Sequence, residues 1–349
     1  MAGAWTGHQF VVWGGMGGAN RDQVFGDGAA YDPATQTWTT LPAAPISARS
    51  SMASVWTGSR LFIWGGYTQL TDGALRTAAD GALYDPAART WRKLPPAPLS
   101  APAFAEAFWL DGKVIVLGSQ YGASPTLGMS AELAMFDPAK NTWSKSIAVP
   151  EKKDQEVSVF AAAATDDRLY VWQEWSHTLD DADGSTATSF GIEPEAFDLA
   201  TIAWISGPAQ SPNAPNGFGS QVWTGNAIYV PDNNGWCGGC AGPPHVAGAG
   251  HLLDPRTNTW TTMPAGPVDR GQPSALWTGS ALLAFNTTME ISGPNAHHLP
   301  GEAAVWDPAT NVWTSLPSAP SADSEVVAVW ANNQLLMWGA RTGGLRFGP

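Results

Sequence analysis

A motif that recurs six times limits what this chain can fold into. An aromatic or apolar residue and an Asp, usually followed by Pro, precede a Trp that always lies six residues after the Asp. The six segments are YDPATQTW (31–38), YDPAARTW (84–91), FDPAKNTW (136–143), FDLATIAW (197–204), LDPRTNTW (253–260) and WDPATNVW (306–313). Pro suits a type I turn and the Asp carboxylate can accept backbone N–H groups, so each segment predicts a hairpin.

A second anchor recurs seven times, at intervals of 51 to 59 residues. It is a turn that starts at Trp5, Trp56, Trp109, Ala164, Trp223, Trp277 and Trp330. Its Thr-Gly, Asp-Gly and Asn-Asn pairs supply the positive φ angles of a tight hairpin. We therefore expect each repeat to be a four-stranded antiparallel sheet, in which this turn joins the first two strands and the Asp-Pro turn joins the last two.

Composition agrees with an all-β chain. Among 349 residues there are 38 Gly and 28 Pro, and only 13% of residues are charged, which favours turns and short strands. Most of the 19 Trp residues fall on repeat positions, so we expect them to pack between adjacent sheets. The sequence predicts one domain, 1–349, with repeats near 1–40, 49–94, 102–146, 157–206, 216–262, 270–315 and 323–349.

The repeat resembles that of the Kelch family of β-propellers, through three features. These are the Gly-Gly that ends the second strand (Gly14-Gly15, Gly65-Gly66), the Tyr-Asp-Pro turn and the Trp that follows it. The resemblance implies a seven-bladed propeller, of a kind found in bacteria, that serves as a binding module, a glycan-handling protein or an enzyme. The Gly-Gly is partly or wholly lost in the third to seventh repeats.

The last repeat is short. Gly343–Pro349 aligns with Asp80–Pro86, so the seventh blade has no fourth strand in this chain. We expect either a truncated form of a longer chain or a ring that closes with a three-stranded blade and an exposed sheet edge.

Charge and hydropathy exclude several classes of partner. The net charge of −13 disfavours binding to nucleic acid and to anionic membrane surfaces. The sequence contains neither an apolar stretch long enough to span a membrane nor a signal peptide. We expect a monomer that requires no cofactor.

Four alternating strands place the long connections on one rim of a propeller, where function is expected. On that rim, three neighbouring repeats carry polar residues in place of Gly-Gly: Gln173-Glu174, Asp232-Asn233 and Asn286-Thr287. The same connections hold Trp175, Trp236 and five of the six histidines. The sequence therefore predicts a ligand site that includes Trp175, Asp232, Asn233, Trp236 and Asn286, although long solvated loops would have a similar composition.

The start of each first strand offers a second set of candidates. Arg49, Asn216 and Arg270 lie seven residues before their Trp anchors, and the two arginines could bind a carboxylate or phosphate. In the similar Kelch-type sialate mutarotases an arginine-containing pocket handles an acidic sugar. The alternative is that each arginine pairs with an acidic residue of a loop.

Cys237, Cys240, His245 and His251 have a spacing compatible with zinc or another divalent metal. A Cys237–Cys240 disulfide is the simpler interpretation, and it would fit a secreted or periplasmic protein. An acidic run, Asp180, Asp181 and Asp183, could bind Ca²⁺ or could be a solvated loop tip.

Acid/base chemistry has four candidate residues, namely Glu174, His177, His297 and His298, with Glu290 near the last two. The sequence holds no nucleophile elbow, Walker loop or HExxH motif. We therefore expect a propeller that binds a glycan, peptide or small anionic molecule on its long-loop rim. The alternative is an epimerase, lyase or hydrolase whose site lies on the same rim in the fourth to sixth blades.

Overall fold

The computed structural model consists of β-strands and turns, with no helix among the residues it describes. It describes residues 1–17, 23–69, 73–102, 104–121, 129–150, 156–180, 186–208, 221–231, 250–268, 274–285, 289–291, 297–299, 302–317, 326–339 and 343–347. No helix in this described part could cross a membrane.

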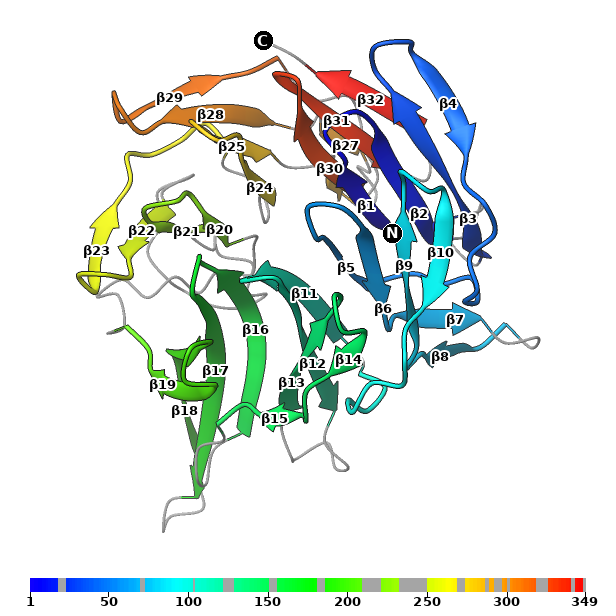
Figure 1. The fold of residues 1–349 in the computed structure, drawn as a ribbon. Coiled ribbons are helices and arrows are strands. Elements are labelled where there is room, and N and C mark those ends of the chain that lie inside the picture. Colours follow the sequence, from blue (N-terminus) through cyan, green and yellow to red (C-terminus); the bar gives the residue numbers. More distant parts are fainter. Residues whose placement is uncertain are drawn as a thin grey trace.

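Six sheets contain the four antiparallel strands expected of a blade, arranged around a ring (Figure 1). The first sheet comprises β1 (Ala2–Trp5), β2 (Phe10–Gly17), β3 (Gln23–Asp32) and β4 (Thr37–Thr40). The second comprises β5 (Ala53–Trp56), β6 (Leu61–Trp64), β9 (Gly81–Asp85) and β10 (Thr90–Lys93). The third comprises β11 (Phe104–Leu110), β12 (Lys113–Tyr121), β13 (Met129–Asp137) and β14 (Thr142–Trp143), and β15 (Ile147–Ala148) also pairs with β13.

The remaining complete sheets follow the same plan. The fourth sheet comprises β16 (Glu156–Ala164), β17 (Arg168–Asp180), β18 (Thr186–Asp198) and β19 (Ala203–Ser206). The fifth comprises β20 (Val222–Trp223), β21 (Ile228–Pro231), β22 (Gly250–Asp254) and β23 (Thr259–Thr262). The sixth comprises β24 (Ser274–Trp277), β25 (Leu282–Phe285), β28 (Ala303–Asp307) and β29 (Val312–Ser315).

The last sheet has three strands, β30 (Val326–Ala331), β31 (Gln334–Gly339) and β32 (Gly343–Phe347). The connections between second and third strands add two small hairpins. These are β7 (Tyr67–Gln69) with β8 (Leu75–Thr77), and β26 (Met289–Ile291) with β27 (His297–Leu299).

The core is divided among the junctions between neighbouring sheets. Second strands such as β6, β21 and β25 are buried at every residue, because each sheet packs against a neighbour on both faces. The last sheet packs against the first through a cluster that includes Phe10, Val12, Ala331 and Leu336. Strand β30 contacts both β24 and β1, so the ring of sheets is closed.

The turn chemistry predicted from the sequence is confirmed. Asp85 Oδ1 accepts the N–H groups of Ala87 and Ala88 at 3.1 and 3.0 Å, and the equivalent carboxylates accept bonds in the other five hairpins. In the turns between first and second strands, Gly7, Gly58 and Gly112 adopt positive φ angles. These two turn types fix the antiparallel register of each sheet.

Candidate functional site

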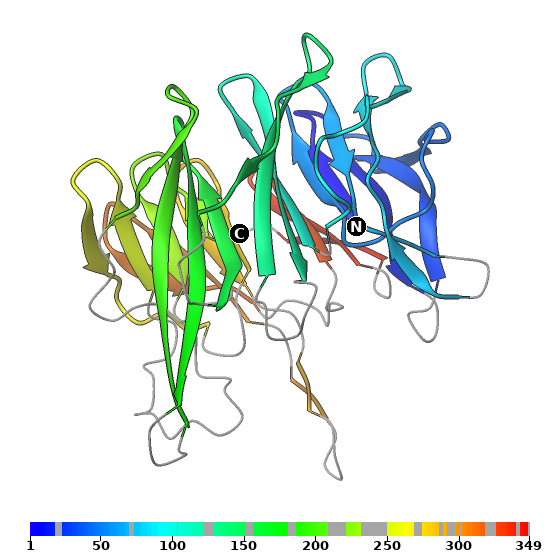
Figure 2. The same cartoon turned by 90° about the horizontal axis from the view of Figure 1, so that it is seen from below.

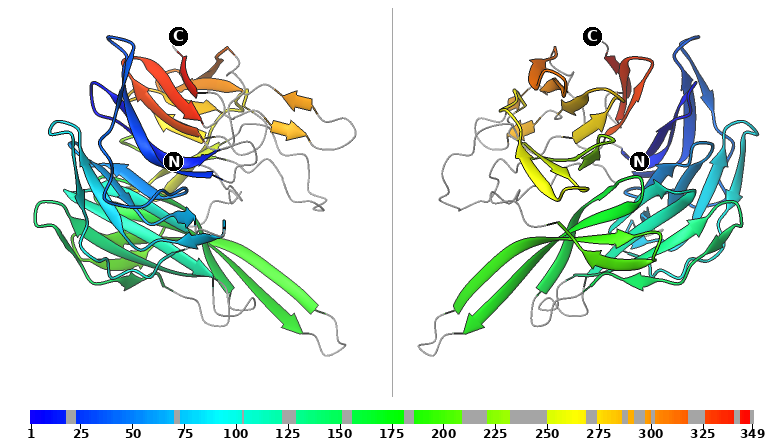
Figure 3. Two further views of the ribbon diagram at one scale, coloured as in Figure 1. Left: turned by 90° about the vertical axis from the view of Figure 1, so that its right-hand side faces the viewer. Right: turned by 60° about the vertical axis from the view of Figure 1, so that its left-hand side comes forward.

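The two rims of the ring differ as expected. The described turns between first and second strands and between third and fourth strands lie on one rim. The ends at which the second strands lead towards the third strands lie on the other, which we call the long-connection rim (Figure 2). Two hairpin arms project from the long-connection rim: the ends of β17 and β18, and the hairpin β26–β27 (Figures 2 and 3). This rim is the candidate functional site.

The longer arm holds three of the predicted site residues. Strands β17 and β18 pair without interruption from Arg168↔Asp198 to Asp180↔Thr186. Glu174, Trp175 and His177 therefore belong to a paired strand, and not to a loop as the sequence suggested. The extension of the ladder beyond β16, whose pairing with β17 reaches Ser176, is what makes the arm project.

The shorter arm holds His297 and His298 in β27. The register places His298 opposite Glu290 and His297 opposite Ile291. For both arms the structure describes the strand pairing and not the side chains, so the acid/base roles of these residues stay predictions.

Several other predicted residues lie outside the described part of the chain. They are Asn216, Asp232, Asn233, Trp236, Cys237, Cys240, His245, Arg270, Asn286, Asp181 and Asp183. The disulfide, the zinc site and the calcium loop therefore stay predictions. Within the described residues, no three His, Cys, Asp or Glu side chains gather in a way that could hold a metal ion.

His251, the fourth proposed zinc ligand, belongs to a packed sheet. It lies in β22 between Val230 and Thr262, and its side chain is only 3% exposed. Its ring meets Trp260 edge-on, with 6.3 Å between the ring centroids. This environment is that of a core histidine, and it gives the zinc interpretation no support.

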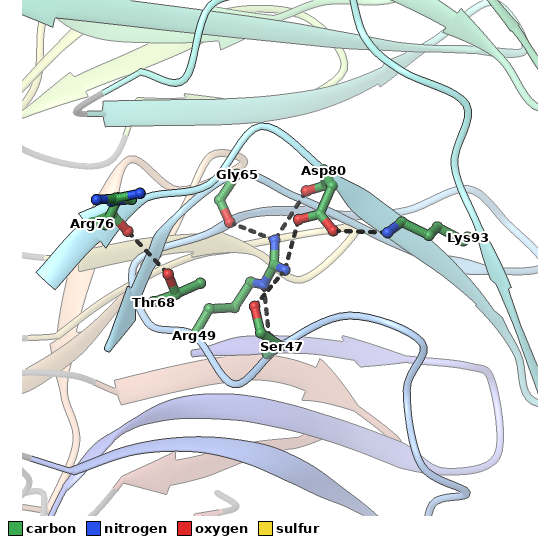
Figure 4. A network of polar contacts seen from close by, with 7 residues as sticks. All are labelled: Ser47, Arg49, Gly65, Thr68, Arg76, Asp80 and Lys93. Carbon is green, nitrogen blue, oxygen red and sulfur yellow. Dashed lines mark hydrogen bonds and ion pairs between the residues drawn. The ribbon is translucent and has the colours of Figure 1, made fainter. Parts of the chain in front are cut away.

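The expectation that Arg49 holds a ligand is corrected by the structure. Its side chain is completely buried, and its guanidinium group donates five hydrogen bonds within the chain (Figure 4). Nη1 donates to the carbonyls of Gly65 and Asp80 at 3.1 and 2.9 Å. Nε and Nη2 donate to Ser47, and Nη2 also donates to Asp80 Oδ1 at 2.8 Å. No donor is left for an anion, and the alternative of an acidic partner is confirmed for Arg49.

Asp80, whose side chain is partly exposed, completes this network. Burial of the carboxyl would raise the pKa of Asp80, but the hydrogen bond and charge of Arg49, together with Lys93, outweigh it and lower that pKa. Lys93 Nζ lies 3.3 Å from Asp80 Oδ2. Arg49 and Asp80 therefore tie the start of the second repeat to the end of β6 and the start of β9.

Glu106 is a candidate that the sequence reasoning missed. It lies on the innermost strand of the third sheet, three residues before Trp109. The protein atoms around the carboxyl of Glu106 displace part of its hydration, and this desolvation raises the pKa of Glu106 to about 7. The residue is nevertheless exposed to solvent. The residues three before the other anchors give the missed signal, because they are small or apolar: Ala2, Ala53, Ala161, Ser220, Ser274 and Val327.

Comparison with known proteins identifies the repeat. Residues 2–172 match the model of the KLHDC2/KLHL20/DRC7 Kelch-repeats domain. The Kelch-like protein terF of Aspergillus terreus is 22% identical over 296 residues, which cover 82% of this chain and 61% of that protein. This chain is a Kelch-repeat β-propeller. The Kelch match and the propeller seen in the structure agree, while the bacterial type stays a prediction because this relative is fungal.

Kelch propellers generally act as scaffolds for protein interaction, and the likeness to them names no ligand. The chain spans about three fifths of the length of the terF protein.

Proposed function

We propose that this Kelch propeller binds an extended segment of a partner polypeptide on the rim from which the two arms project. The observation that carries the proposal is the length of the β17–β18 arm, whose ladder runs to the pair Asp180↔Thr186. Its outer strand β18 pairs with β19 only at residues 195–198, so among the described residues the stretch 186–194 has an unpaired outer edge. Such an edge can add a peptide strand through backbone hydrogen bonds.

A polypeptide is a better ligand for this rim than an anion. One of the two arginines expected to grip an anion, Arg49, is buried and fully bonded. Glycans and small anions, and the enzymatic alternative with Glu174, His177, His297 or His298, remain part of the test.

We further propose that the three-stranded sheet β30–β32 is the seventh blade, which its packing against both neighbours supports. An extracytoplasmic location also stays a proposal.

The proposal is tested by shortening the arm. Residues 177–189 are replaced by Asn-Gly, which leaves Trp175↔Gly191 as an intact pair near the new turn. Peptides selected from a display library against the parent chain should bind the shortened chain at least about tenfold more weakly, since backbone pairing along the arm is lost. The thermal denaturation midpoint should change little, because the replaced residues lie beyond the contacts of β17 with β16.

The matched control is Lys140→Ala, an exposed change in the turn between third and fourth strands on the opposite rim. It should leave peptide binding unchanged. Equal affinity of the parent and shortened chains would contradict the proposal. So would a screen in which the parent chain binds only glycans or small anions, or converts one of them chemically.

A further inference from the structure

Gln173 is a buried polar side chain whose amide is unpaired at both ends. It is 1% exposed, and among the described residues neither its amide nitrogen nor its amide oxygen has a hydrogen-bond partner. It stands at the position of Gly14 and Gly65, where the first two repeats have no side chain. A buried amide without partners is unfavourable, which indicates that a donor and an acceptor from elsewhere complete this site.

The strand pairing shows which neighbouring sheet Gln173 faces. Side chains alternate between the two faces of a strand, and β17 pairs with β18 without a shift of register. Gln173 therefore points to the same side as Leu169 and Val171, which pack in the cluster between the third and fourth sheets. The amide lies just beyond Val171, on the side of this junction towards the long-connection rim.

Two polar side chains of the third sheet face the same junction. In β11, Glu106 lies two residues before Phe108, which packs against the same cluster. In β12, Ser119 lies two residues after Leu117 of that cluster and is 7% exposed. Strands β11 and β12 pair in regular register, so both polar side chains point towards the fourth sheet. The first strands of the two sheets, β11 and β16, lie side by side (Figure 1).

The carboxyl of Glu106 has no charge of opposite sign beside it among the described residues. Desolvation is the one cause of its raised pKa, with no contribution from a hydrogen bond or a neighbouring charge. Phe104 lies on the same face of β11, directly opposite Ser119, and is 52% exposed. A carboxylate beside an exposed aromatic ring suits a positively charged group that carries apolar atoms.

We propose that this end of the junction between the third and fourth sheets binds the free amino terminus of the partner polypeptide. The α-ammonium group donates to the Glu106 carboxylate and to Ser119 Oγ. The first peptide group pairs with the Gln173 amide, which donates to a carbonyl and accepts from an N–H. The first side chain lies on the ring of Phe104. This inference rests on the proposed function, because it names the part of the polypeptide that the rim binds.

Other ligand classes match these groups less well. The charged form of Glu106 would repel a carboxylate or a phosphate. A glycan could bond to Gln173 and Ser119, but it would leave the charge of Glu106 unbalanced. An amino terminus carries a positive charge next to a peptide donor and acceptor, so it matches all three polar groups. Phe104 and Glu106 are exposed, so they can change rotamer to admit it to the buried amide.

The probe is the octapeptide Leu-Ala-Ser-Gly-Ser-Gly-Ser-Lys with fluorescein on its lysine side chain. The full chain 1–349 should bind this peptide, as measured by fluorescence anisotropy. Acetylation of the α-amino group should weaken binding at least about tenfold, because it removes the charge and two of the three donors. Gly in place of the first Leu should weaken binding several-fold, because Phe104 loses its apolar partner.

Two changes in the protein test the location. Gln173→Leu removes the amide at similar size, and Glu106→Gln removes the charge; each should weaken octapeptide binding at least about tenfold. The thermal denaturation midpoint of Gln173→Leu should stay the same or rise, because an unpaired buried amide is lost. Asp111→Asn is the matched control. It removes the same charge from the exposed turn between β11 and β12 on the opposite rim, and it should leave binding unchanged.

Equal binding of the free and acetylated octapeptides would overturn the inference, whether or not the variants fold. So would undiminished binding by a folded Glu106→Gln or Gln173→Leu chain. A lower midpoint of Gln173→Leu together with undiminished binding would assign the amide to a buried water instead.

The chain with the shortened arm separates this inference from the proposed function. Display-selected peptides that need the arm but tolerate acetylation would leave the proposed function standing and overturn the amino-terminal site. Peptides that bind the shortened chain as tightly as the parent, yet lose binding on acetylation, would support the amino-terminal site and contradict the role of the arm.

Discussion

Two charged residues of this propeller, Arg49 and Glu106, stand at positions where most of the other repeats have uncharged residues. The charge of Arg49 is stabilised by hydrogen bonds within the chain, whereas the charged form of Glu106 is disfavoured by desolvation. Arg49 is buried with five hydrogen bonds, one of them to the carboxylate of Asp80. Glu106 occupies an inner-strand position where the other repeats have small or apolar residues, and its pKa is raised to about 7.

The raised pKa of Glu106 predicts a dependence of stability on pH. Its ordinary pKa of 4.5 is the reference for the unfolded chain, so between pH 4.5 and 7 the folded chain binds the proton more tightly. This contribution to stability is fully present below pH 4.5 and is lost as pH rises towards 7 and above. Glu106→Gln should therefore be more stable than the parent at pH 8, by about 1 kcal/mol, a value reduced because solvent reaches the side chain.

Urea denaturation at pH 5 and pH 8 measures this effect. The gain in the free energy of unfolding on Glu106→Gln should be larger at pH 8 than at pH 5. The same difference at both pH values would show that Glu106 does not titrate in this window.

The role of Arg49 could not be predicted from its sequence position. Seven residues before the Trp anchor lie residues as different as Arg49, Pro102, Val157 and Asn216. The acidic partner of Arg49 is Asp80, which lies 31 residues away in sequence, and only the folded second sheet brings the two together. Spacing along the chain carries no signal for such a contact.

At the scale of strands and turns, the sequence predicted most of the fold. The two turn anchors predicted the hairpins of every complete sheet, because each turn type requires particular residues at fixed positions. The left-handed residue four after each turn Asp was not predicted. Asn141, Asn258 and Asn311 suit that conformation, but Gln36, Arg89 and Ile202 also adopt it, with φ between 53° and 56°.

The arms were also missed by the sequence reasoning. Residues 168–180 and 186–198 were expected to include a loop, and they form one continuous ladder. Repeat alignment could not predict this arm, because in the part of the chain that the structure describes no other repeat has a ladder of that length at the same place. The hairpin β26–β27 could not be predicted from the repeat alignment either, for the same reason.

The Gly-Gly pair that ends the second strand of the first two repeats has a steric reason. Gly58 and Gly66 have similar φ angles, +82° and +86°, but different surroundings. A Cβ atom at Gly58 would meet no other atom within 4 Å, whereas one at Gly66 would collide with the carbonyl oxygen of Ser50 and lie 2.9 Å from Met52 Cα. Gly66 therefore permits the close approach of the chain that leads into β5.

This difference predicts unequal costs for the same substitution. Gly58→Ala should lower the free energy of unfolding by about 1 kcal/mol, which is the cost of a left-handed Ala. Gly66→Ala should lower it by about 2–4 kcal/mol, since the backbone must also move. Chemical denaturation of both variants measures the difference, and equal losses would show that the backbone approach at Gly66 is unimportant.

At the scale of the whole molecule, the ring depends on the contact between its first and last sheets. A side chain at Gly3 in β1 would collide with Val327 in β30. Across the same junction, the ring centroids of Trp38 and Trp338 lie 4.7 Å apart. These contacts close the circle of sheets.

A graded series at Gly3 tests this closure. Gly3→Ala should lower the free energy of unfolding by about 1 kcal/mol and Gly3→Val by about 3 kcal/mol, because a larger side chain forces the two sheets further apart. Limited proteolysis should cut Gly3→Val faster than the parent. A Gly3→Val chain as stable and as resistant as the parent would mean that the junction adapts without cost.

The junction between the first and last sheets has a mechanical consequence. In the described part of the chain, β1–β4 share no strand ladder with β30–β32, and the two sheets meet through side chains. A force that pulls the two ends apart would meet dispersed apolar contacts there before it loaded the backbone hydrogen bonds inside any sheet. The first and last sheets would then separate and leave an open arc of intact sheets, before any single sheet unfolded.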